Sequence, residues 1–318
     1  MSKPVVLLFE PIHEKAVQIL KEQADVRMAA SLDEDALVQT VADVDGIIIR
    51  ANGKVSRRLM EAAPRLKVVG RHGVGIEAID RVAAAERGIT VVNTPDANLE
   101  SVAEQCIGMM IALAKRLLQA DRALRAGDWD SRYRLTGVEL LGKTLGVVGF
   151  GRIGQRVAEI GHVAFQMPVL YHDVVEYPEA ERALGARKVS LDVLLPAADF
   201  VSVHAPLLPA TTGLINEAAL RQMKPTAYLI NSSRGPVVDQ AALVRALSEG
   251  WIAGAGLDVF DPEPLPADSP ILSLENVVVS PHMAAHTDEA LLRMAMVVED
   301  VLAVIAGKSP RHAVPAPG

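Results

Sequence analysis

A glycine-rich loop between a short apolar run and a helical pattern limits the fold of this chain more than any other feature. Residues 145–148 read Leu-Gly-Val-Val, residues 149–154 read Gly-Phe-Gly-Arg-Ile-Gly, and apolar positions then recur at helical spacing. Gly149 allows a tight turn, Gly151 lets the backbone approach a pyrophosphate, and Gly154 lets helix and strand pack closely. The strand, loop and helix together predict a dinucleotide-binding α/β domain.

An acidic residue at the end of the next strand indicates which dinucleotide is bound. Residues 169–172 read Val-Leu-Tyr-His and predict a strand that ends at Asp173, 24 residues after Gly149. The fold places a carboxylate near this position to bind the ribose 2′-hydroxyl, and the same charge would repel a 2′-phosphate. No Arg or Lys follows before Arg182, so we predict NAD rather than NADP.

The length and composition of the chain suit two domains of the α/β class. At 318 residues the chain exceeds the usual size of a single hydrophobic core. Apolar residues make up 50% of the chain and aromatic residues only 3%, which suits parallel strands covered by helices on both faces. We therefore predict two Rossmann-like, doubly wound domains.

Strand and helix patterns alternate in two separate series along the chain. In the first series we predict strands at residues 5–9, 44–49, 66–69 and 89–92, and helices at residues 13–22, 33–41 and 56–63, with Ser31 or Asp33 and Ser56 as N-caps. A long helix is predicted over residues 98–125, the second series runs over residues 143–281, and a last helix spans residues 287–307.

The last helix is expected to return to the first series, which gives the chain a discontinuous domain. Residues 1–98 and 287–318 would then form a flavodoxin-like substrate-binding domain, and residues 99–286 a Rossmann cofactor domain inserted into it. Two crossings between the domains would leave a cleft, which is a common place for a ligand site.

Three polar residues follow predicted strands of the second series, at the sheet edge where open α/β sheets bind ligands. Arg234 could bind a substrate carboxylate through two hydrogen bonds and polarise the neighbouring carbonyl. His282 suits proton exchange with a hydroxyl or carbonyl group near neutral pH, and Glu263 could orient its ring and favour the imidazolium. Each residue alone would more often be structural, but beside a dinucleotide loop the three together predict catalysis.

Charge, cysteine content and missing motifs argue against other classes of protein. The formal charge of −7 without a basic tract disfavours nucleic-acid binding, and no apolar run approaches the roughly 20 residues that span a bilayer. Cys106 is the only cysteine and lies among apolar residues, so we expect a packed thiol in a reducing compartment. Glu10 interrupts the apolar segment that a signal peptide would need, so we expect a cytoplasmic location. No metal-ligand spacing, GxSxG motif or GxxxxGK[ST] motif occurs.

Seven stretches spread over nearly the whole chain resemble the D-isomer-specific 2-hydroxyacid dehydrogenases, most closely the D-3-phosphoglycerate dehydrogenase branch. The similar stretches are residues 69–75, 92–95, 149–154, 204–206, 231–235, 257–260 and 280–282. The resemblance implies hydride transfer between NAD(H) and a small 2-hydroxy or 2-keto acid. It also implies that Arg234 binds the substrate carboxylate and carbonyl, that His282 is the acid and base, and that Glu263 pairs with His282.

The resemblance extends to further cofactor and substrate residues. Asp258 is expected to contact the nicotinamide carboxamide, and the backbone near His72 to meet the substrate. Together with the glycine loop, the residues predicted to bind NAD are Val74, Gly149, Gly151, Arg152, Ile153, Gly154, Asp173, Ala205, Ser232, Ser233, Asp258, His282 and Ala285. Those predicted to bind substrate are Arg50, Ala51, His72, Gly73, Val74 and Arg234.

Enzymes of this kind are usually homodimers, and the resemblance places the helix from Asn98 and the loop around Trp129 at the interface. Arg50 and Arg71, with Arg132 or Arg134 of the partner subunit, could form a second anion site for a phosphate or sulfonate. Solvated surface arginines are the alternative reading.

Several departures from the phosphoglycerate pattern leave the substrate open. Ala51 stands where Ser is common, residues 77–78 read Glu-Ala where Asp-Asn is usual, and residues 284–285 read Ala-Ala in place of a Gly-containing turn. A doubly anionic acid such as D-3-phosphoglycerate is predicted, with a hydroxypyruvate/glyoxylate reductase or a non-enzymatic, NAD-responsive corepressor-like dimer as alternatives. A serine-binding regulatory domain is not expected, and Glu263 argues against a formate dehydrogenase, which would place Gln beside its His.

Overall fold

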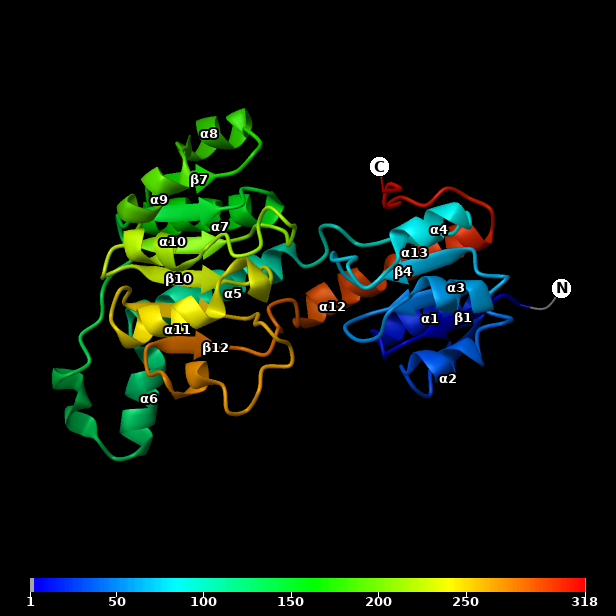
Figure 1. The fold of residues 1–318 in the computed structure, drawn as a ribbon, viewed down its shortest axis with the longest axis horizontal. Helices are drawn as coiled ribbons and strands as arrows, with labels where there is room; N and C mark the ends of the chain where they lie inside the picture. The colour runs from blue at the N-terminus through cyan, green and yellow to red at the C-terminus, as the bar shows by residue number, and fades with distance from the viewer. Residues whose placement is uncertain (1–2, 318) are drawn as a thin grey trace. The chain divides into compact units, whose positions relative to one another are not determined.

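The computed structural model describes residues 3–317 and contains two parallel β-sheets with helices on both faces, which confirms the predicted α/β class (Figure 1). The chain divides into two compact units, which are unit 1 (Met1–Asn98 with His286–Gly318) and unit 2 (Leu99–Ala285). Unit 2 is a continuous segment inserted into unit 1. His286 groups with unit 1, one residue before the boundary expected from the sequence.

Unit 1 contains a five-stranded sheet in the order β2-β1-β3-β4-β5, the flavodoxin-like order. Its strands are β1 (Val5–Leu8), β2 (Asp25–Met28), β3 (Gly46–Ile49), β4 (Val68–Arg71) and β5 (Thr90–Val92). Its helices are α1 (Glu14–Gln23), α2 (Glu34–Val38), α3 (Arg57–Ala62), α4 (Arg81–Glu86), α12 (Asp288–Ala295) and α13 (Val297–Ile305).

Two hydrophobic layers enclose the sheet of unit 1. Buried residues of α2, α3 and α4 pack on one face, and those of α1 and α13 pack on the other. Helix α13 approaches the strands closely, since a Cβ atom at Gly70 of β4 would lie 2.6 Å from Cγ2 of Val301. The buried runs of β1, β3 and β4 match the strands predicted from β-branched residues.

Unit 2 contains a seven-stranded sheet in the order β12-β11-β10-β9-β6-β7-β8, the Rossmann order extended by one strand. Its strands are β6 (Leu145–Val148), β7 (Val169–His172), β8 (Arg187–Lys188), β9 (Phe200–Val203), β10 (Tyr228–Asn231), β11 (Gly254–Leu257) and β12 (Val277–Val279). Its helices are α5 (Leu99–Ala114), α6 (Leu117–Arg125), α7 (Arg152–Phe165), α8 (Pro178–Leu184), α9 (Leu191–Ala197), α10 (Glu217–Gln222) and α11 (Gln240–Ser248), with 3₁₀ turns η1 (Trp129–Tyr133), η2 (Gly235–Val237) and η3 (Pro270–Ser273).

The strand order of unit 2 reverses at β6, which has β7 on one side and β9 on the other. Such a reversal opens a crevice at the carboxyl ends of the strands, where ligands of this fold class bind. Helices α5 and α7 cover one face of the sheet, and α9, α10 and α11 cover the other. The loops that follow β6, β9, β10, β11 and β12 therefore share one edge.

The structure corrects the two longest predicted helices. The helix predicted over residues 98–125 is interrupted, since Arg116 is left-handed with a φ of +51° between α5 and α6. The N–H of Val138 donates to the carbonyl of Ala114 (2.8 Å), so a crossing segment takes the acceptor that would extend α5. The last helix is divided at Met296, whose N–H also bonds to the carbonyl three residues earlier, a tightening typical of a 3₁₀ turn.

Candidate active site

The glycine loop connects β6 to α7, and packing requires two of its glycines. Gly149 has a φ of +88°, and a Cβ atom there would lie 2.5 Å from the backbone nitrogen of Ala205. A Cβ atom at Gly154 would lie 2.3 Å from the carbonyl oxygen of Gly149. The loop can therefore keep this shape only with glycine at both positions.

Gly151 leaves open space beside the N-terminus of α7. No atom lies within 4 Å of the position that a Cβ atom would take there, and Gly151 caps α7 without a side-chain hydrogen bond. The first N–H groups of a helix, here those of Arg152, Ile153 and Gly154, have no partner inside the helix and favour an anion. The open face at Gly151 and these N–H groups fit the pyrophosphate of a dinucleotide.

Asp173 ties the end of β7 to the glycine loop. Its Oδ2 accepts a hydrogen bond from the N–H of Phe150 (2.6 Å), and its Oδ1 accepts one from the N–H of Val175 (2.9 Å). A carboxylate oxygen can accept more than one hydrogen bond, so a sugar hydroxyl could still donate to Asp173. The next residues, Val174 and Val175, are exposed and uncharged.

A buried asparagine at the end of β10 shapes the loop that carries Arg234. The Asn231 side chain donates to the carbonyl of Arg234 (3.1 Å) and accepts from the N–H (3.1 Å) and the hydroxyl (2.8 Å) of Ser233. The hydroxyl of Ser232 is buried and lacks a hydrogen-bond partner of normal geometry within residues 3–317. A buried polar atom of this kind fits a site completed by a polar ligand.

Glu263 and His282 form a hydrogen-bonded pair in unit 2. Nδ1 of His282 lies 2.8 Å from Oε2 of Glu263, and Oε1 accepts from the N–H of Phe260 (3.0 Å). Burial raises the pKa of Glu263, but the hydrogen bonds to His282 and Phe260 and the positive charge of Arg234 outweigh burial, so the pKa is lowered. The carboxylate is therefore charged at neutral pH, and it orients the ring through Nδ1 while leaving Nε2 for another partner.

Asp258 is buried after β11 and holds the turn on which His282 lies. Its Oδ1 accepts from the N–H of Met283 (2.8 Å) and the hydroxyl of Ser280 (2.5 Å), and its Oδ2 accepts from the N–H of Ala284 (2.9 Å). The N–H of His282 donates to the Asp258 carbonyl (2.8 Å). His282 has a φ of +50°, which is unfavourable for a residue with a Cβ atom, so these bonds stabilise a strained backbone.

Helix α5 supports the same turn from the other side. Ser101 is buried and donates to the carbonyl of Ala284 (2.5 Å), and Gln105 donates to the hydroxyl of Ser280 (3.2 Å). Cys106 is buried on this helix, and burial raises the pKa of its thiol to about 11, which confirms the expected packed thiol. Ala285 packs against the hydrophobic cluster that includes Cys106.

The predicted substrate residues of unit 1 follow β3 and β4. Arg50 donates through Nη1 to the carbonyl of Pro11 (2.9 Å). The N–H of Ala51 donates to Oε2 of Glu10 (2.6 Å), so a carboxylate of the chain already engages this N–H. Gly73 has a φ of +125°, and its N–H donates to the hydroxyl of Thr94 (3.1 Å).

His72 lies in a positive electrostatic field. His72 is only 3% exposed. Burial, together with the charges of Arg50 and Arg71, lowers the pKa of its imidazole to about 4. The imidazole is therefore neutral near pH 7. The next residue but one, Val74, is exposed, and its carbonyl accepts from the side chain of Asn93 (3.0 Å).

The structure thus gathers the predicted residues in two groups, one in each unit. Arg234, Glu263 and His282 lie at the carboxyl-terminal edge of the seven-stranded sheet, whereas Arg50 and His72 lie at the corresponding edge of the five-stranded sheet. Two features were not predicted from the sequence, namely the role of Asn231 in shaping the Arg234 loop and that of Asp258 in holding the His282 turn. A polar residue directly after a buried strand was the available signal for both.

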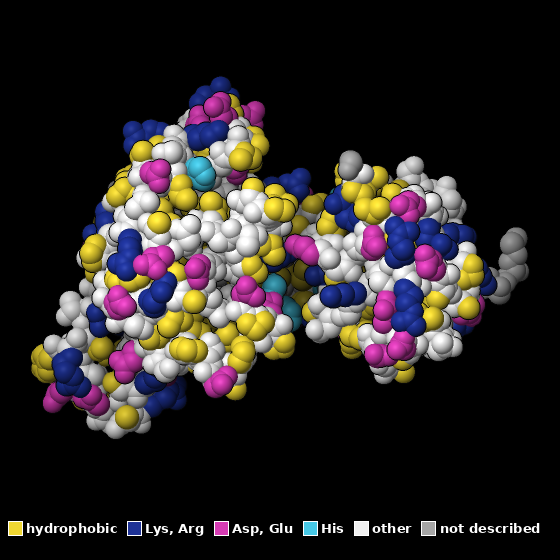
Figure 2. Space-filling model, in the orientation of Figure 1, with side chains coloured by type: hydrophobic (Ala, Val, Ile, Leu, Met, Phe, Trp, Pro, Cys, Tyr) yellow, Lys and Arg dark blue, Asp and Glu magenta, His cyan; other side chains and the backbone are white. Residues whose placement is uncertain are grey.

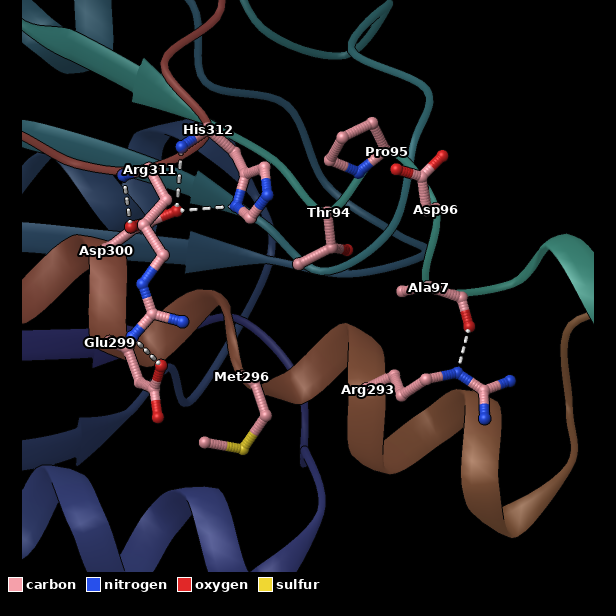
Figure 3. A pocket seen from close by; sticks show the side chains of 10 residues that line it. All are labelled: Thr94, Pro95, Asp96, Ala97, Arg293, Met296, Glu299, Asp300, Arg311 and His312. Atoms are coloured by element: carbon pink, nitrogen blue, oxygen red, sulfur yellow. Dashed lines mark hydrogen bonds and ion pairs between the residues drawn. The ribbon is translucent and has the colours of Figure 1, made fainter. Parts of the chain in front are cut away.

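A small cavity of about 200 Å³ within unit 1 holds none of the predicted site residues (Figure 3). Its charged groups are engaged by neighbours, since Arg311 pairs with Glu299 (2.8 Å) and Arg293 donates to the carbonyl of Ala97 (2.8 Å). Buried Asp300 accepts from the N–H groups of Arg311 (2.7 Å) and His312 (3.1 Å). These contacts anchor the C-terminal segment to α13. The cavity is lined by Thr94, Pro95, Asp96, Ala97, Arg293, Met296, Glu299, Asp300, Arg311 and His312.

Acidic and basic side chains are interspersed on the face shown in Figure 2. Within residues 3–317 no group of three or more His, Cys, Asp or Glu side chains is placed to hold a metal ion. None of the helices in this range has the length and apolar character needed to cross a membrane.

Comparison with known proteins shows the family to which the chain belongs. Residues 107–284 match the family model described as D-isomer specific 2-hydroxyacid dehydrogenase, NAD binding domain. The chain belongs to this family. Most of unit 2, including the glycine loop and the residues around His282, lies within the matched segment. The chain is therefore an oxidoreductase, and residues 107–284 are its NAD-binding part.

Relatives of this dehydrogenase carry different names. A glyoxylate reductase of Thermofilum pendens is 43% identical over 98% of this chain and 94% of the relative. A D-3-phosphoglycerate dehydrogenase of Methanocaldococcus jannaschii is 41% identical over 98% of this chain but only 59% of the relative. The crystal structure of an NADPH-dependent glyoxylate/hydroxypyruvate reductase of Sinorhizobium meliloti has a TM-score of 0.89 and 34% identity, covering 99% of this chain and 98% of that one.

Proposed function

We propose that this dehydrogenase interconverts a 2-hydroxy acid and its 2-keto acid, with His282 exchanging the hydroxyl proton and Arg234 binding the carboxylate and carbonyl. The observation that carries the proposal is the Glu263–His282 hydrogen bond of 2.8 Å, with Arg234 close enough for its charge to lower the pKa of Glu263. An acid–base pair beside a fixed guanidinium suits reduction of a carbonyl next to a carboxylate.

Each residue has a separate task in this scheme. The guanidinium of Arg234 orients the substrate and stabilises negative charge on the carbonyl oxygen as it forms. Nε2 of His282 gives its proton to that oxygen during reduction and takes it back during oxidation, while Glu263 stabilises the imidazolium. Bound NAD(H) supplies or accepts the hydride. Gly149, Gly151, Gly154 and Asp173, with the α7 N-terminus, would hold it.

For the nicotinamide cofactor we propose NAD rather than NADP. The support is Asp173, whose charge would repel a 2′-phosphate, together with the uncharged, exposed residues that follow it. The test is kcat/KM for NADH and NADPH at one substrate concentration. A preference for NADPH, the cofactor of the Sinorhizobium meliloti relative, would contradict the proposal.

For the substrate we propose a 2-keto acid with a second anionic group, such as 3-phosphohydroxypyruvate. The support is the positive field in unit 1, where the charges of Arg50 and Arg71 both act on buried His72. A neutral imidazole beside guanidinium groups adds hydrogen-bonding capacity without negative charge, which suits a phosphate or sulfonate.

The test is NADH oxidation with 3-phosphohydroxypyruvate, sulfopyruvate, hydroxypyruvate, glyoxylate and pyruvate. We expect the doubly anionic acids to have the highest kcat/KM, and Arg50→Gln to lower their advantage over glyoxylate roughly tenfold or more through loss of a charge-assisted hydrogen bond. The exposed Arg87 of unit 1 offers a matched control, and Arg87→Gln should leave the ratio unchanged.

A specific observation favours a second candidate, a glyoxylate/hydroxypyruvate reductase. Glu10 already accepts hydrogen bonds from the N–H groups of Ala51 (2.6 Å) and Asn52 (2.7 Å), so these donors are taken and a negative charge lies beside them. A small monoanionic acid would not need these donors. Highest kcat/KM with glyoxylate or hydroxypyruvate, unaffected by Arg50→Gln, would support this candidate and contradict the second anion site.

We also propose that the dehydrogenase forms a homodimer through the arm made by α6 and η1, which extends from the sheet of unit 2 at the lower left of Figure 1. Helix α6 is amphipathic but has no buried residue, and Leu124, Trp129 and Tyr133 are 56%, 61% and 71% exposed. Large exposed apolar side chains on one element are typical of an interface. Sedimentation at micromolar protein should give a dimer, and Leu124→Glu with Trp129→Glu should shift it to monomer. A wild-type monomer would contradict this.

A further inference from the structure

The loop that carries Glu263 is exposed, although its carboxylate must keep a fixed position beside His282. Residues 261–264 are all solvent-exposed and form no helix or strand. Besides the bond to His282, the Glu263 carboxylate accepts a hydrogen bond from the N–H of Phe260, the residue before the loop (3.0 Å). A loop of this kind needs a contact to a rigid element if its functional side chain is to stay within reach of its partner.

Gln240 provides such a contact from α11. Its Nε2 donates to the carbonyl of Asp261 (2.9 Å), and its Oε1 accepts from the N–H of the same residue (3.1 Å). One side-chain amide therefore satisfies both backbone groups of Asp261, two residues before Glu263. A reciprocal pair of hydrogen bonds fixes both the distance and the orientation of the peptide backbone.

The element that bears Gln240 is itself firmly held. Gln240 is the first residue of α11, whose N-cap Asp239 accepts from the N–H of Ala242 (2.9 Å). Ala242 and Leu243 are buried in the hydrophobic core beneath the helix. The buried residues of α11 therefore fix the position of Gln240, and the Gln240 amide fixes the backbone of Asp261.

On the opposite side the loop packs against the segment after Arg234. A Cβ atom at Gly235 would lie 1.8 Å from the carbonyl oxygen of Phe260, so the two backbones are in direct contact. Gly235 limits how closely the loop approaches, and Gln240 prevents it from moving away. The loop that bears Glu263 is in this way set relative to both Arg234 and α11.

We propose that Gln240 is a positioning residue that holds the Glu263 carboxylate against Nδ1 of His282. The inference rests on the proposed acid–base role of His282. When the amide is lost, the Asp261 backbone can hydrogen-bond to water, the exposed loop moves, and the Glu263–His282 bond is made for only part of the time. The imidazolium needed for carbonyl reduction is then less stabilised.

The test compares Gln240→Met, which keeps the length of the side chain but removes both hydrogen bonds, with wild type in NADH-dependent reduction of the preferred 2-keto acid. We expect kcat to fall roughly tenfold, a fraction of the 10²–10⁴-fold that a positioned acid contributes, while KM changes less than about twofold. The alkaline limb of the kcat profile should move to lower pH, because the imidazolium loses its proton more easily. Ser248→Ala, which removes a hydrogen bond to Val244 at the other end of α11, is the matched control and should behave as wild type.

A readout without turnover keeps this inference separate from the proposed function. The Nδ1 proton of His282 is followed by NMR in histidine-labelled protein, with Glu263→Gln to assign it, and should weaken or disappear in Gln240→Met. A persisting Nδ1 signal, or a lowered thermal midpoint with unchanged kcat and pH profile, would overturn the positioning role. Wild-type protein that shows the signal but reduces none of the keto acids would instead contradict the proposed function, and loss of the signal in Gln240→Met would still support the positioning role.

Discussion

At the scale of single residues, the site depends on a histidine with an unusual backbone. His282 has a φ of +50°, and residues with a Cβ atom reach this region at a cost of about 1–3 kcal/mol. The N–H groups of Met283 and Ala284 and the hydroxyl of Ser280 donate to the buried Asp258 carboxylate, and these three hydrogen bonds offset that cost. In this backbone conformation Nδ1 of His282 lies 2.8 Å from Oε2 of Glu263.

The lowered pKa of Glu263 leads to a prediction on pH. Because its hydrogen bonds outweigh burial, the folded-state pKa lies below the unfolded value of about 4.3, and the stabilisation is present above that pH and lost as pH falls through the folded pKa. The pair is therefore intact across the neutral range. Glu263→Gln should lower kcat for carbonyl reduction by about 10–100-fold and move the alkaline limb of the profile to lower pH, since the charge that favours imidazolium is gone.

The steady-state pH profile of the variant, measured with the preferred keto acid from pH 5 to 9, checks this prediction. Glu275→Gln changes an exposed carboxylate outside the candidate site and serves as the charge-matched control. An unchanged alkaline limb in Glu263→Gln would mean that the carboxylate does not stabilise the imidazolium.

At the scale of secondary-structure elements, the buried strands could be predicted and the helix ends could not. The predicted strands at residues 145–148 and 169–172 match β6 and β7, because short apolar runs are typical of strands buried in a parallel sheet. Strand β2 reads Asp-Val-Arg-Met and is largely exposed at the sheet edge, so it carries no apolar signal. The break at Arg116 depends on the contact between Ala114 and the distant Val138, which periodicity does not encode, whereas the break at Met296 is a local 3₁₀ turn.

Some residues of the candidate site could be predicted from the sequence and others could not. Glycines 149 and 154 and residues Glu263 and His282 could be predicted, because sterics and chemistry restrict each to few residue types. Asn231 and Gln240 could not, since a polar residue that supports a loop looks like any other polar residue until the loop is placed. Asp258 was predicted as a cofactor contact, and its hydrogen bonds to residues 280–284 were visible only in three dimensions.

The contact between helix α7 and the glycine loop can be tested by one substitution. A Cβ atom at Gly154 would lie 2.3 Å from a backbone oxygen, so Gly154→Ala should force the helix away from the loop, cost about 1–3 kcal/mol of the free energy of unfolding and weaken NADH binding. Gly108 in α5 is the matched control, because no atom lies within 4 Å of its Cβ position, and Gly108→Ala should stabilise by about 0.5–1 kcal/mol. Urea unfolding and NADH fluorescence titration measure both effects, and equal behaviour of the two variants would contradict the argument.

At the scale of the whole molecule, two histidines with lowered pKa values make the fold sensitive to acid. Burial lowers the pKa of His204 to about 4, and burial with the charges of Arg50 and Arg71 lowers that of His72 to about 4. The unfolded chain binds these protons near pH 6.5, whereas the folded chain does not. Stability is therefore fully retained above about pH 6.5 and falls as pH drops toward 4, by up to about 1.4 kcal/mol per pH unit for each histidine.

Unfolding midpoints between pH 7 and 4.5 provide the measurement. His204→Asn should unfold with a shallower dependence on pH in this range, by about one proton, than wild-type protein. Ser248→Ala at the end of α11 removes no titratable group and should leave the slope as it is. Identical slopes in all three proteins would show that His204 is protonated in the folded state.

The position of α13 sets the order in which the chain can fold during synthesis. Residues of α13 line one face of the first sheet, opposite Val6, Leu8, Ile48 and Val68, yet they lie beyond the whole of unit 2 in the sequence. At ribosomal rates of about 5–20 residues per second, the intervening segment takes roughly 10–40 s to translate. For that time this face of the N-terminal sheet is covered by α1 without α13, so the unit that is made first is the one completed last.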